Sequence, residues 1–435
     1  MSSIVILGTG IGGMSAAYEI RDTLGKDHTV TVVGEGSHFN FTPSNPWVAV
    51  GWRALDDIRV DVTQPLAGRG IEFINSQATR VSPENNQVTL SDGRTLDYDY
   101  LVIATGPRLA FERIAGSAPD SRAVQSVCTG PHAHQAWLAY QEFLKHPGPV
   151  VVGAVQQASC FGPAYEYAMI LDTDLRRRKI RHLVPMTFVT SEPYIGHMGL
   201  GGVGDSKALL ESELRKRHIK WVTNARVTSV EPGIIHAEEI DEHGTVHQKH
   251  DLPFSYSMLL PSFAGVDAVK GIEGLVNPGG FVLIDAHQRN PAFPNIYAAG
   301  VCVAIPPLEA TPVPIGVPKT GLMIESMVSA IAQNLRDTIA GKPVHARATW
   351  NAVCLADMGD TGFAFIALPQ IPPRNVTKTM TGKWVHQAKE IYEKYFLRKI
   401  RKGQGEPIYE KYIMRALGIE RLTPEDADQP DQQHR

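Results

Sequence analysis

Apolar residues cluster in short runs near the start of the chain. Ile4 to Leu7 is a run rich in β-branched residues, which predicts a buried strand. Met14 to Ile20 has the pattern of a helix, and Thr29 to Val33 has that of a second buried strand. This order of strand, helix and strand is typical of an α/β fold with a parallel sheet.

Three glycines separate the first strand from the helix. Gly8, Gly10 and Gly13 follow in the order G-x-G-x-x-G. Gly8 permits a tight turn, Gly10 lets a pyrophosphate approach the backbone, and Gly13 lets the helix pack close to the strand. Glu35 ends the second strand and would accept hydrogen bonds from a ribose. The pattern predicts a dinucleotide site, and a glycine-rich turn without a ligand is the alternative.

The same strand–turn–helix pattern recurs from Pro149 to Tyr167. Its three key positions are Gly153, Val155 and Ala158. The Val155 side chain would block a pyrophosphate, so we expect a second Rossmann-like domain that binds no NAD(P)H. Cys160 lies at or just before the start of the following helix, where the helix dipole would stabilise a thiolate.

Further elements follow from the same patterns. Strands are predicted over 97–107, 186–189, 221–230, 282–285 and 295–300, and helices over 206–217 and from 319 to about 340. The ends of two of these strands are small residues that let a dinucleotide approach the backbone closely: Ala104, Thr105, Gly106 and Gly300, with Val301 after them. Lys319 opens the last helix, and it either stabilises negative charge on a reduced flavin or is an exposed helix-start lysine.

The loop 36–60 is dense in aromatic residues and prolines, Pro43 among them. It is either a wall against a flavin ring or a packed surface loop. The C-terminal segment places Trp384, Ala388, Ile391, Tyr395 and Ile400 at helical spacing among many basic residues. A helix with an apolar face beside a basic face is expected to lie in the headgroup region of an anionic bilayer. An amphipathic helix docked on its own protein is the alternative.

Length, charge and cysteine spacing limit the possibilities. A chain of 435 residues exceeds one core, so we expect two Rossmann-like domains and a C-terminal region: 1–115 with 270–345, 116–269, and 346–435. The net charge of −3 suggests no nucleic-acid partner. The four cysteines form no C-x-x-C pair, so no metal site is expected. We see no signal peptide and no apolar run of about 18 residues.

Six segments carry a family resemblance. They are FTPSNPWVAVGW (41–52), YLVIATGP (100–107), SCFGPAYEYAM (159–169), SEPYIGH (191–197), PKTGLMIESM (318–327) and WNAVCLADMGD (350–360). Together with Cys128, Cys160 and Cys354 they resemble the bacterial sulfide:quinone oxidoreductases, flavoproteins of the disulfide reductase superfamily. The resemblance covers nearly the whole chain. One departure from the wider superfamily is Val301, which stands where an aspartate holds the ribityl chain. This implies a contact from backbone N–H groups instead.

The resemblance implies an enzyme on a membrane surface. It would hold FAD, oxidise hydrogen sulfide or hydrosulfide to polysulfide or elemental sulfur, and reduce ubiquinone or menaquinone. Cys160 and Cys354 would form the redox pair, with extra sulfur as an optional bridge. Cys128 is a candidate for covalent attachment of FAD. Tyr392 and Tyr409 match quinone-contact positions, the former commonly a phenylalanine.

The resemblance also bears on proton transfer and location. Glu166, six residues after Cys160, would accept a proton from the sulfide if burial raises its pKa. His132 and His197 match family positions, and structural roles are their alternative in a chain with 16 histidines. The implied location is peripheral or monotopic on the bacterial cytoplasmic membrane, on either face. A homo-oligomer is compatible with the sequence.

Three rival functions share parts of the pattern. The flavoprotein subunit of flavocytochrome c sulfide dehydrogenase shares the fold, but the basic, aromatic C-terminus argues against it. A type II NADH:quinone oxidoreductase would need a working second fingerprint and no cysteine pair. A non-enzymatic flavin-binding redox sensor would need neither the cysteine pair nor a quinone pocket.

Overall fold

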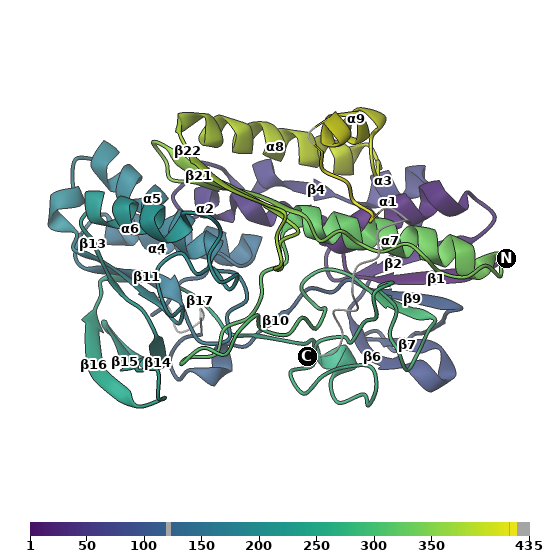
Figure 1. Cartoon of the computed structure of the whole chain (residues 1–435), viewed down its shortest axis with the longest axis horizontal. Helices are drawn as coiled ribbons and strands as arrows, with labels where there is room; N and C mark the ends of the chain where they lie inside the picture. The colour runs from purple at the N-terminus through teal and green to yellow at the C-terminus, as the bar shows by residue number, and fades with distance from the viewer. Residues whose placement is uncertain (119–122, 417, 424–435) are drawn as a thin grey trace.

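The computed structural model describes residues 1–118, 123–416 and 418–423, without the side chains of residues 408, 409, 413 and 416. Two lobes lie side by side, and helices α8 (Lys383–Arg401) and α9 (Ile408–Ala416) lie along their upper side in Figure 1.

The first lobe is built on a five-stranded parallel sheet. Its strand order is β19-β9-β1-β2-β5, with bounds β1 (Ser3–Leu7), β2 (Thr29–Gly34), β5 (Glu72–Asn75), β9 (Tyr100–Ile103) and β19 (Ile296–Ala298). Ile4 pairs with Val30 on one side and with Tyr100 on the other. Helices α1 (Ile11–Leu24) and α7 (Gly321–Ile339) pack against each other on this lobe. The predicted first strand, helix and second strand are confirmed.

The second lobe has a four-stranded parallel sheet in the order β13-β12-β11-β17. Its elements are β11 (Val150–Ala154), β12 (Met186–Thr190), β13 (Ile219–Val222), β17 (Tyr256–Leu260), α4 (Gly130–Phe143), α5 (Gly162–Arg177) and α6 (Ser206–Lys216). Every residue of β11 is buried, as expected for a strand covered on both faces. The strand and helix predicted from Pro149 to Tyr167 are therefore present. The domain limits at residues 115, 270 and 346 stay predictions.

Short antiparallel sheets and turns complete the two lobes. The strands are β3 (His38–Asn40) with β4 (Arg59–Asp61), β6 (Ala78–Ser82) with β7 (Gln87–Leu90) and β8 (Thr95–Asp97), β10 (Arg108–Leu109) with β18 (Phe263–Ala264), and β14 (Ala225–Glu231) with β15 (Ile234–Ile240) and β16 (Val246–Pro253). The short helices are α2 (Asn45–Val48), α3 (Thr63–Gly68), η1 (Thr42–Ser44), η2 (Leu55–Ile58), η3 (Pro83–Asn85), η4 (Phe111–Arg113), η6 (Arg181–Leu183) and η7 (Asp267–Val269).

Four strand predictions were wrong in extent, and one of them, 295–300, is limited to the three residues of β19. The segment 221–230 forms two strands, β13 and β14, because Asn224 between them has a left-handed φ of 49°. The segment 282–285 is irregular, since the Asp285 carboxylate accepts hydrogen bonds from backbone N–H groups two and four residues later and turns the chain. The strand predicted over 97–107 is limited to the four residues of β9.

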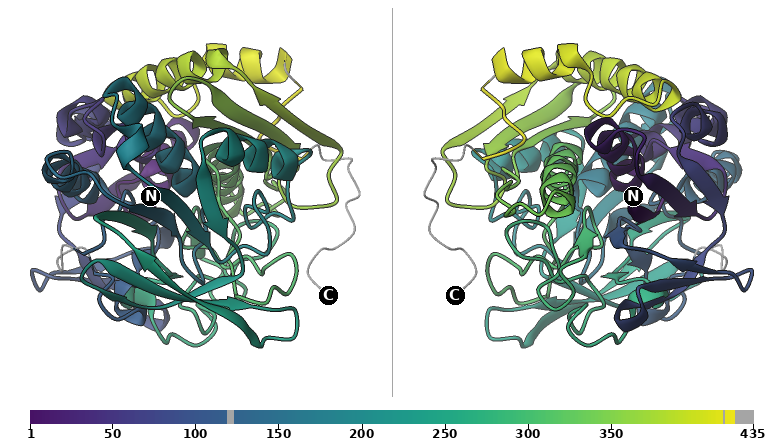
Figure 2. Two further views of the ribbon diagram at one scale, coloured as in Figure 1. Left: turned by 90° about the vertical axis from the view of Figure 1, so that its left-hand side faces the viewer. Right: turned by 90° about the vertical axis from the view of Figure 1, so that its right-hand side faces the viewer.

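The C-terminal region adds a layer over both lobes. An antiparallel sheet of β20 (Ala352–Asp357), β21 (Gly362–Leu368) and β22 (Val376–Thr381) lies under α8, as both views in Figure 2 show. This sheet was not predicted from the sequence. It carries Cys354 in β20, beside Phe365 of β21.

The aromatic loop 36–60 is a docking surface for α8. Phe39 and Phe41 are fully buried, and their ring centroids lie 5.8 and 5.4 Å from that of Phe396 on α8. Phe41 also meets Tyr392 edge-on at 5.7 Å. Such ring pairs stabilise by about 0.5–1.5 kcal/mol each beyond burial. The aromatic residues of the loop therefore fix the C-terminal layer onto the first lobe.

The outer face of α8 differs in part from the prediction. Trp384 and Ile391 are exposed, at 45% and 68%, as predicted for a membrane-facing side. Ile400 is instead fully buried. Lys389 and Lys399, expected on the basic outer face, are also buried because they form ion pairs with carboxylates beneath the helix. The helix thus docks on its own protein and keeps a narrower apolar outer face.

Candidate active site

The first turn of the N-terminal lobe has the geometry of a dinucleotide cradle. Gly8 has a φ of 115°, and a Cβ there or at Gly13 would collide with the backbone of the turn or of Ala104. A Cβ at Gly10 would meet no protein atom within 4 Å. The turn therefore has no room for side chains at Gly8 and Gly13, while the space beside Gly10 is free of protein atoms, as a bound pyrophosphate requires.

Other predicted cofactor residues surround this cradle. Ala104 and Thr105 after β9 lie against Gly8, and Gly300 after β19 lies against Ile324 of α7. Gly106 and Val301 follow the same two strands, Glu35 is exposed after β2, and Pro43 is half-buried in η1. The Thr320 hydroxyl at the start of α7 is buried without a hydrogen-bond partner among the described residues. Burial lowers the pKa of Lys319 to about 8, and the Cys302 and Cys160 thiols oppose this shift. The residues present fit FAD.

Three cysteines form the second part of the candidate active site. Cys160 lies between β11 and α5, Cys354 lies in β20, and Cys128 precedes α4. Burial raises the pKa of Cys160 to about 12, and the neighbouring Cys354 and Cys128 thiols raise it further. The prediction of a stabilised Cys160 thiolate is therefore wrong, because desolvation outweighs the hydrogen bond from the backbone of Gly162.

The fourth cysteine lies apart from this group. Cys302 is buried, and its Sγ donates hydrogen bonds to the carbonyls of Ile103 and Ala299. Burial raises its pKa to about 11. It has the surroundings expected of an inert core thiol.

Glu166 forms a buried ion pair with Lys389, which joins α5 to α8. Burial raises the pKa of Glu166 to about 7, and the Lys389 ammonium lowers it in part. Both charges act on Cys354: Glu166 raises the pKa of its thiol, and Lys389 lowers it. The carboxyl predicted as an acid–base group thus lies in electrostatic range of the sulfur atoms.

The two predicted histidines are placed differently. The His132 ring meets Phe111 edge-on at 5.6 Å near the start of α4, and burial lowers its pKa. His197 is 1% exposed, and its Nε2 lies 2.7 Å from Glu309 Oε1. Its Nδ1 accepts a hydrogen bond from the N–H of Gly199, so Nε2 carries the proton. The contacts of these rings are therefore with neighbouring loops.

Two residues of the second Rossmann-like lobe bear on nucleotide binding. Val155 is buried in the core of the second lobe, and the prediction that its side chain blocks a pyrophosphate stays a prediction. Glu192, which follows β12 where such folds place a ribose-binding carboxylate, is also turned inward. Its carboxylate accepts hydrogen bonds from Tyr165, Thr190 and the N–H of Met198. The Glu192 carboxylate is thus used in internal hydrogen bonds, and the absence of an NAD(P)H site stays a prediction.

Tyr392 points from α8 toward the start of α7. A Cβ on Gly321 would lie 3.4 Å from the Tyr392 hydroxyl. Burial raises the pKa of this hydroxyl, and the charges of Glu325 and Glu410 raise it further. Tyr409 lies in α9, and its side chain is outside the described part of the structure. The predicted quinone position Tyr392 is therefore next to Gly321, the first residue of α7, two residues after Lys319.

A second buried ionic cluster stands beside Tyr392. Lys399 of α8 pairs with Glu325 of α7 and with Glu410 of α9. Arg421 lies 3.3 Å from Glu325 and 3.4 Å from Glu19 of α1. The cluster joins four helices, so it fixes the C-terminal helices over the first lobe.

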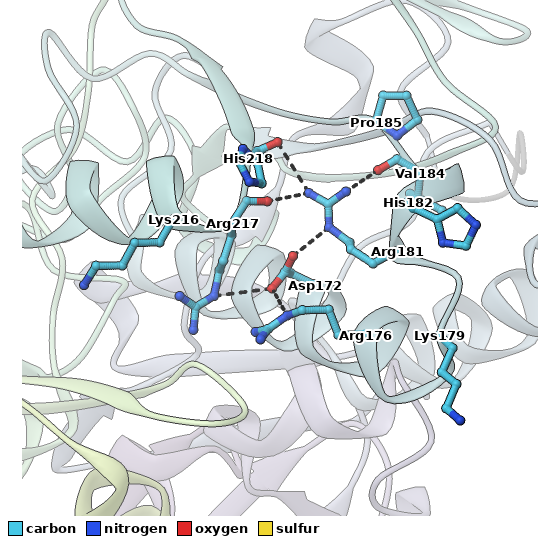
Figure 3. Close-up of a pocket in the computed structure, with 10 residues that line it drawn as sticks. All are labelled: Asp172, Arg176, Lys179, Arg181, His182, Val184, Pro185, Lys216, Arg217 and His218. Atoms are coloured by element: carbon cyan, nitrogen blue, oxygen red, sulfur yellow. Dashed lines mark hydrogen bonds and ion pairs between the residues drawn. The ribbon is translucent and has the colours of Figure 1, made fainter.

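An open cavity of about 690 Å³ lies away from the cysteines, at the ends of α5 and α6. Figure 3 shows that its arginines converge on Asp172 while its lysines point outward. Arg181 Nε lies 2.6 Å from Asp172, and its other nitrogens donate to the carbonyls of Val184 and Arg217. Since these donors are satisfied internally, the cluster braces the second lobe.

Sequence reasoning missed Lys389 and Asp357. Lys389 falls in the same helical phase as Val385 and Phe396, which are buried. A charged residue in the apolar phase of an amphipathic helix was the available signal. Asp357 comes three residues after Cys354, and its carboxylate is fully buried. Nothing in the local sequence marks it.

Helices that could cross a membrane are not found within the described residues. The exposed side of the C-terminal helices combines apolar and basic groups: Trp384, Ile391 and Tyr412 with Lys394, Arg398, Arg401, Lys402 and Lys411. Figure 1 shows α8 and α9 on one side of the molecule.

The chain is similar to characterised proteins along almost its whole length. The family model for pyridine nucleotide-disulphide oxidoreductases matches residues 2–171. The sulfide-quinone reductase of Aquifex aeolicus (strain VF5) is 42% identical over 406 residues, 93% of this chain and 92% of that protein. The mitochondrial sulfide:quinone oxidoreductase of Mus musculus is 23% identical over 310 residues, 70% of this chain and 66% of that protein. The X-ray structure of the Aquifex aeolicus sulfide:quinone oxidoreductase matches with a TM-score of 0.93 at 40% identity, over 100% of both chains.

Proposed function

The chain belongs to the sulfide:quinone oxidoreductase family, and we propose that it oxidises hydrosulfide at Cys160 and Cys354 and passes the electrons through FAD to a quinone. The observation that carries the site assignment is the gathering of these thiols with Glu166, and of Cys160 with Lys319. A nicotinamide-dependent enzyme would need an open second nucleotide turn, which Val155 closes.

The sulfur chemistry begins at a bridge between the two cysteines. Hydrosulfide attacks this bridge, a disulfide or one extended by extra sulfur. One cysteine becomes a persulfide as the old bond breaks, and the other leaves as a thiolate. Burial and the Glu166 carboxylate raise the pKa of Cys354, and the Lys389 ammonium opposes part of this shift, so either cysteine can be the one that leaves as the thiolate. Repeated attack after each electron transfer lengthens the sulfur chain to a polysulfide.

Glu166 serves as the base for this step. Its raised pKa of about 7 lets the carboxylate accept a proton from hydrogen sulfide or hydrosulfide and release it again near neutral pH. His132 and His197 are the other proposed acid–base groups of the site.

The cofactor would be held by the glycine turn and by the start of α7. Bound FAD would supply a two-electron acceptor for the thiolate and the persulfide, which form a new S–S bond as the electrons leave, and would pass these electrons to the quinone. Lys319 would balance the negative charge of the reduced ring. Cys128 is the proposed position of a covalent FAD link, which an intact-mass measurement under denaturing conditions tests directly.

The quinone would bind against Tyr392 and Tyr409 under the C-terminal helices. The exposed Trp384 and Ile391 would enter the headgroup region of the bacterial cytoplasmic membrane, with the surrounding lysines and arginines facing anionic lipids. The attachment is peripheral.

The assignment is tested with purified holoprotein, sulfide and a short-chain quinone, beside the same protein with NADH. We expect the flavin to bleach with sulfide and to reoxidise with quinone. Cys160→Ala and Cys354→Ala should abolish bleaching while FAD stays bound. Cys302→Ser is the matched control and should retain activity, because a hydroxyl can keep both hydrogen bonds of that thiol. Bleaching by NADH alone, or full activity in either cysteine variant, would contradict the proposal.

A further inference from the structure

Arg421 lies in the short segment that follows α9, and its side chain is buried among carboxylates. Its Nη2 donates to Glu410 of α9 and lies 3.3 Å from Glu325 Oε1 of α7. Its Nη1 lies 3.4 Å from Glu19 Oε2 of α1, and its Nε lies 3.5 Å from Glu406 Oε1 in the loop between α8 and α9. The Arg421 side chain is only 6% exposed. One guanidinium therefore joins three helices and a loop.

The backbone around Arg421 is fixed as well. The N–H of Thr349 donates to the Arg421 carbonyl at 3.1 Å, and the N–H of Thr423 donates to the Arg347 carbonyl at 2.9 Å. Arg347 and Thr349 lead into β20. Because the backbone is held on this side, the guanidinium has a defined position, and its several N–H donors reach several carboxylates from there.

Helix α9 depends on ionic contacts for its attachment. No side chain of α9 that the structure describes is fully buried, and Glu410 is one of the two that are half-buried. The Glu410 carboxylate contacts Arg421, Lys399 of α8 and the Tyr395 hydroxyl. These contacts tie α9 to the rest of the protein through one carboxylate.

This carboxylate stands beside the proposed quinone position. Glu410 directly follows Tyr409 in the sequence. Glu325 comes four residues after Gly321, about one turn further along α7, and the Tyr392 hydroxyl packs against Gly321. The spacing between α9 and α7 therefore decides how far Tyr409 lies from Tyr392.

We propose that Arg421 is a positioning residue for quinone reduction: by tying α9 to α7 it sets the width of the pocket in which the quinone binds. The inference rests on the proposed quinone site at Tyr392 and Tyr409. Arg421 transfers no electron and no proton. An arginine suits this role because its guanidinium stays charged at every working pH.

The test is Arg421→Gln in the full-length holoenzyme with a short-chain quinone. The KM for the quinone should rise by about tenfold or more, because a shift of about 1 Å in a binding wall has effects of this size. The kcat at saturating quinone and the rate of flavin bleaching by sulfide should each stay within about twofold of the wild type. A general loss of structure would instead slow both half-reactions.

Two further variants sharpen the comparison. Arg415→Gln is the matched control, because Arg415 is an exposed arginine on α9 itself, and its KM for the quinone should equal that of the wild type. Arg421→Lys keeps the charge but carries its donors on a single nitrogen, so it serves fewer carboxylates. Its KM should lie between those of the wild type and Arg421→Gln. If Arg421→Gln holds no FAD, Arg421→Lys replaces it in the test.

The outcomes are distinct. An unchanged KM in the tested Arg421 variant overturns the inference and leaves the sulfide–quinone activity in place. Bleaching by sulfide that is slowed by more than about twofold also overturns it, because Arg421 would then support the whole protein and not the quinone pocket. An equal rise of KM in Arg415→Gln overturns it too, since any lost charge on α9 would then have the same effect. A wild type without sulfide-dependent quinone reduction overturns both the proposed function and this inference.

Discussion

Lys389 of α8 and Glu166 of α5 form a buried ion pair across 223 residues of sequence. The pair joins the C-terminal helix to the lobe that carries Cys160. A buried charge is tolerated only when it is paired, so this contact gives α8 a fixed position relative to the sulfur site. The same helix carries the proposed quinone contact and the apolar outer face. Helix α8 therefore connects the sulfur site, the proposed quinone site and the proposed membrane surface.

Removal of Lys389 should destabilise the protein. Lys389→Met leaves the Glu166 carboxylate buried without its partner, and we expect a loss of about 3–5 kcal/mol in the free energy of unfolding. The pKa of Glu166 should rise further in this variant. The loss in the free energy of unfolding should therefore be smaller at a pH below that pKa, because the Glu166 carboxyl is then neutral and needs no partner. Denaturant unfolding at acidic and at mildly alkaline pH measures both effects. Lys394→Met, an exposed lysine on the same helix, should change stability little.

Glu166 should control the pH dependence of flavin reduction. Because a base must be deprotonated to act, the rate of bleaching by sulfide should rise as pH passes through about 7. Glu166→Gln should lower the rate by about 10²-fold or more and remove this rise. Stopped-flow absorbance across this pH range makes the comparison. An unchanged pH profile in the variant would assign the base to another group.

Glu192 should contribute a pH dependence of stability. Burial raises its pKa from 4.5 to about 7 in the folded protein, so the folded state binds the proton more tightly than the unfolded chain. Stability should therefore fall as pH rises from about 4.5 to about 7 and then level off, with Glu192 accounting for about 3 kcal/mol. Glu192→Gln should reduce this fall, as measured by urea unfolding at several pH values. An identical slope in both proteins would contradict the assignment.

Membrane attachment should depend on the apolar outer face of α8. The double substitution of Trp384 and Ile391 by serine should weaken binding to anionic vesicles by at least about tenfold, because each side chain contributes about 1.5–3 kcal/mol when buried. Leu138→Ser, on α4 and 43% exposed, is the control and should bind normally. Cosedimentation with vesicles at two salt concentrations separates the apolar contribution to membrane binding from the ionic one. Equal binding of all three proteins would rule out this face.

Point substitutions test this better than deletion of the C-terminal segment. A deletion from Lys383 would uncover Phe39 and Phe41 and remove the partners of Glu166 and Glu325. The shortened protein would then lose stability as well as its outer face.

The sequence by itself determined the local elements and most of the chemistry. The glycine turn, the buried first strands and the replacement by Val155 are readable because each depends on neighbours within a few residues. The cysteines and Glu166 were found through the family resemblance, and the structure brings them together. The break between β13 and β14 within 221–230 and the irregular backbone of 282–285 were not predicted, since a left-handed Asn224 and the Asp285 turn leave the apolar pattern nearly unchanged.

Only the tertiary structure decided which charges of α8 face inward. Lys389, Lys399 and Lys394 look alike in sequence, yet two are buried against carboxylates from α5 and α7 and the third is exposed. The same holds for Asp357, whose buried carboxylate contacts Trp47 and His386 from distant segments. Such choices rest on desolvation and on pairing between residues that are far apart in sequence. The helical phase of Lys389 signals its burial, but no local pattern encodes the partners.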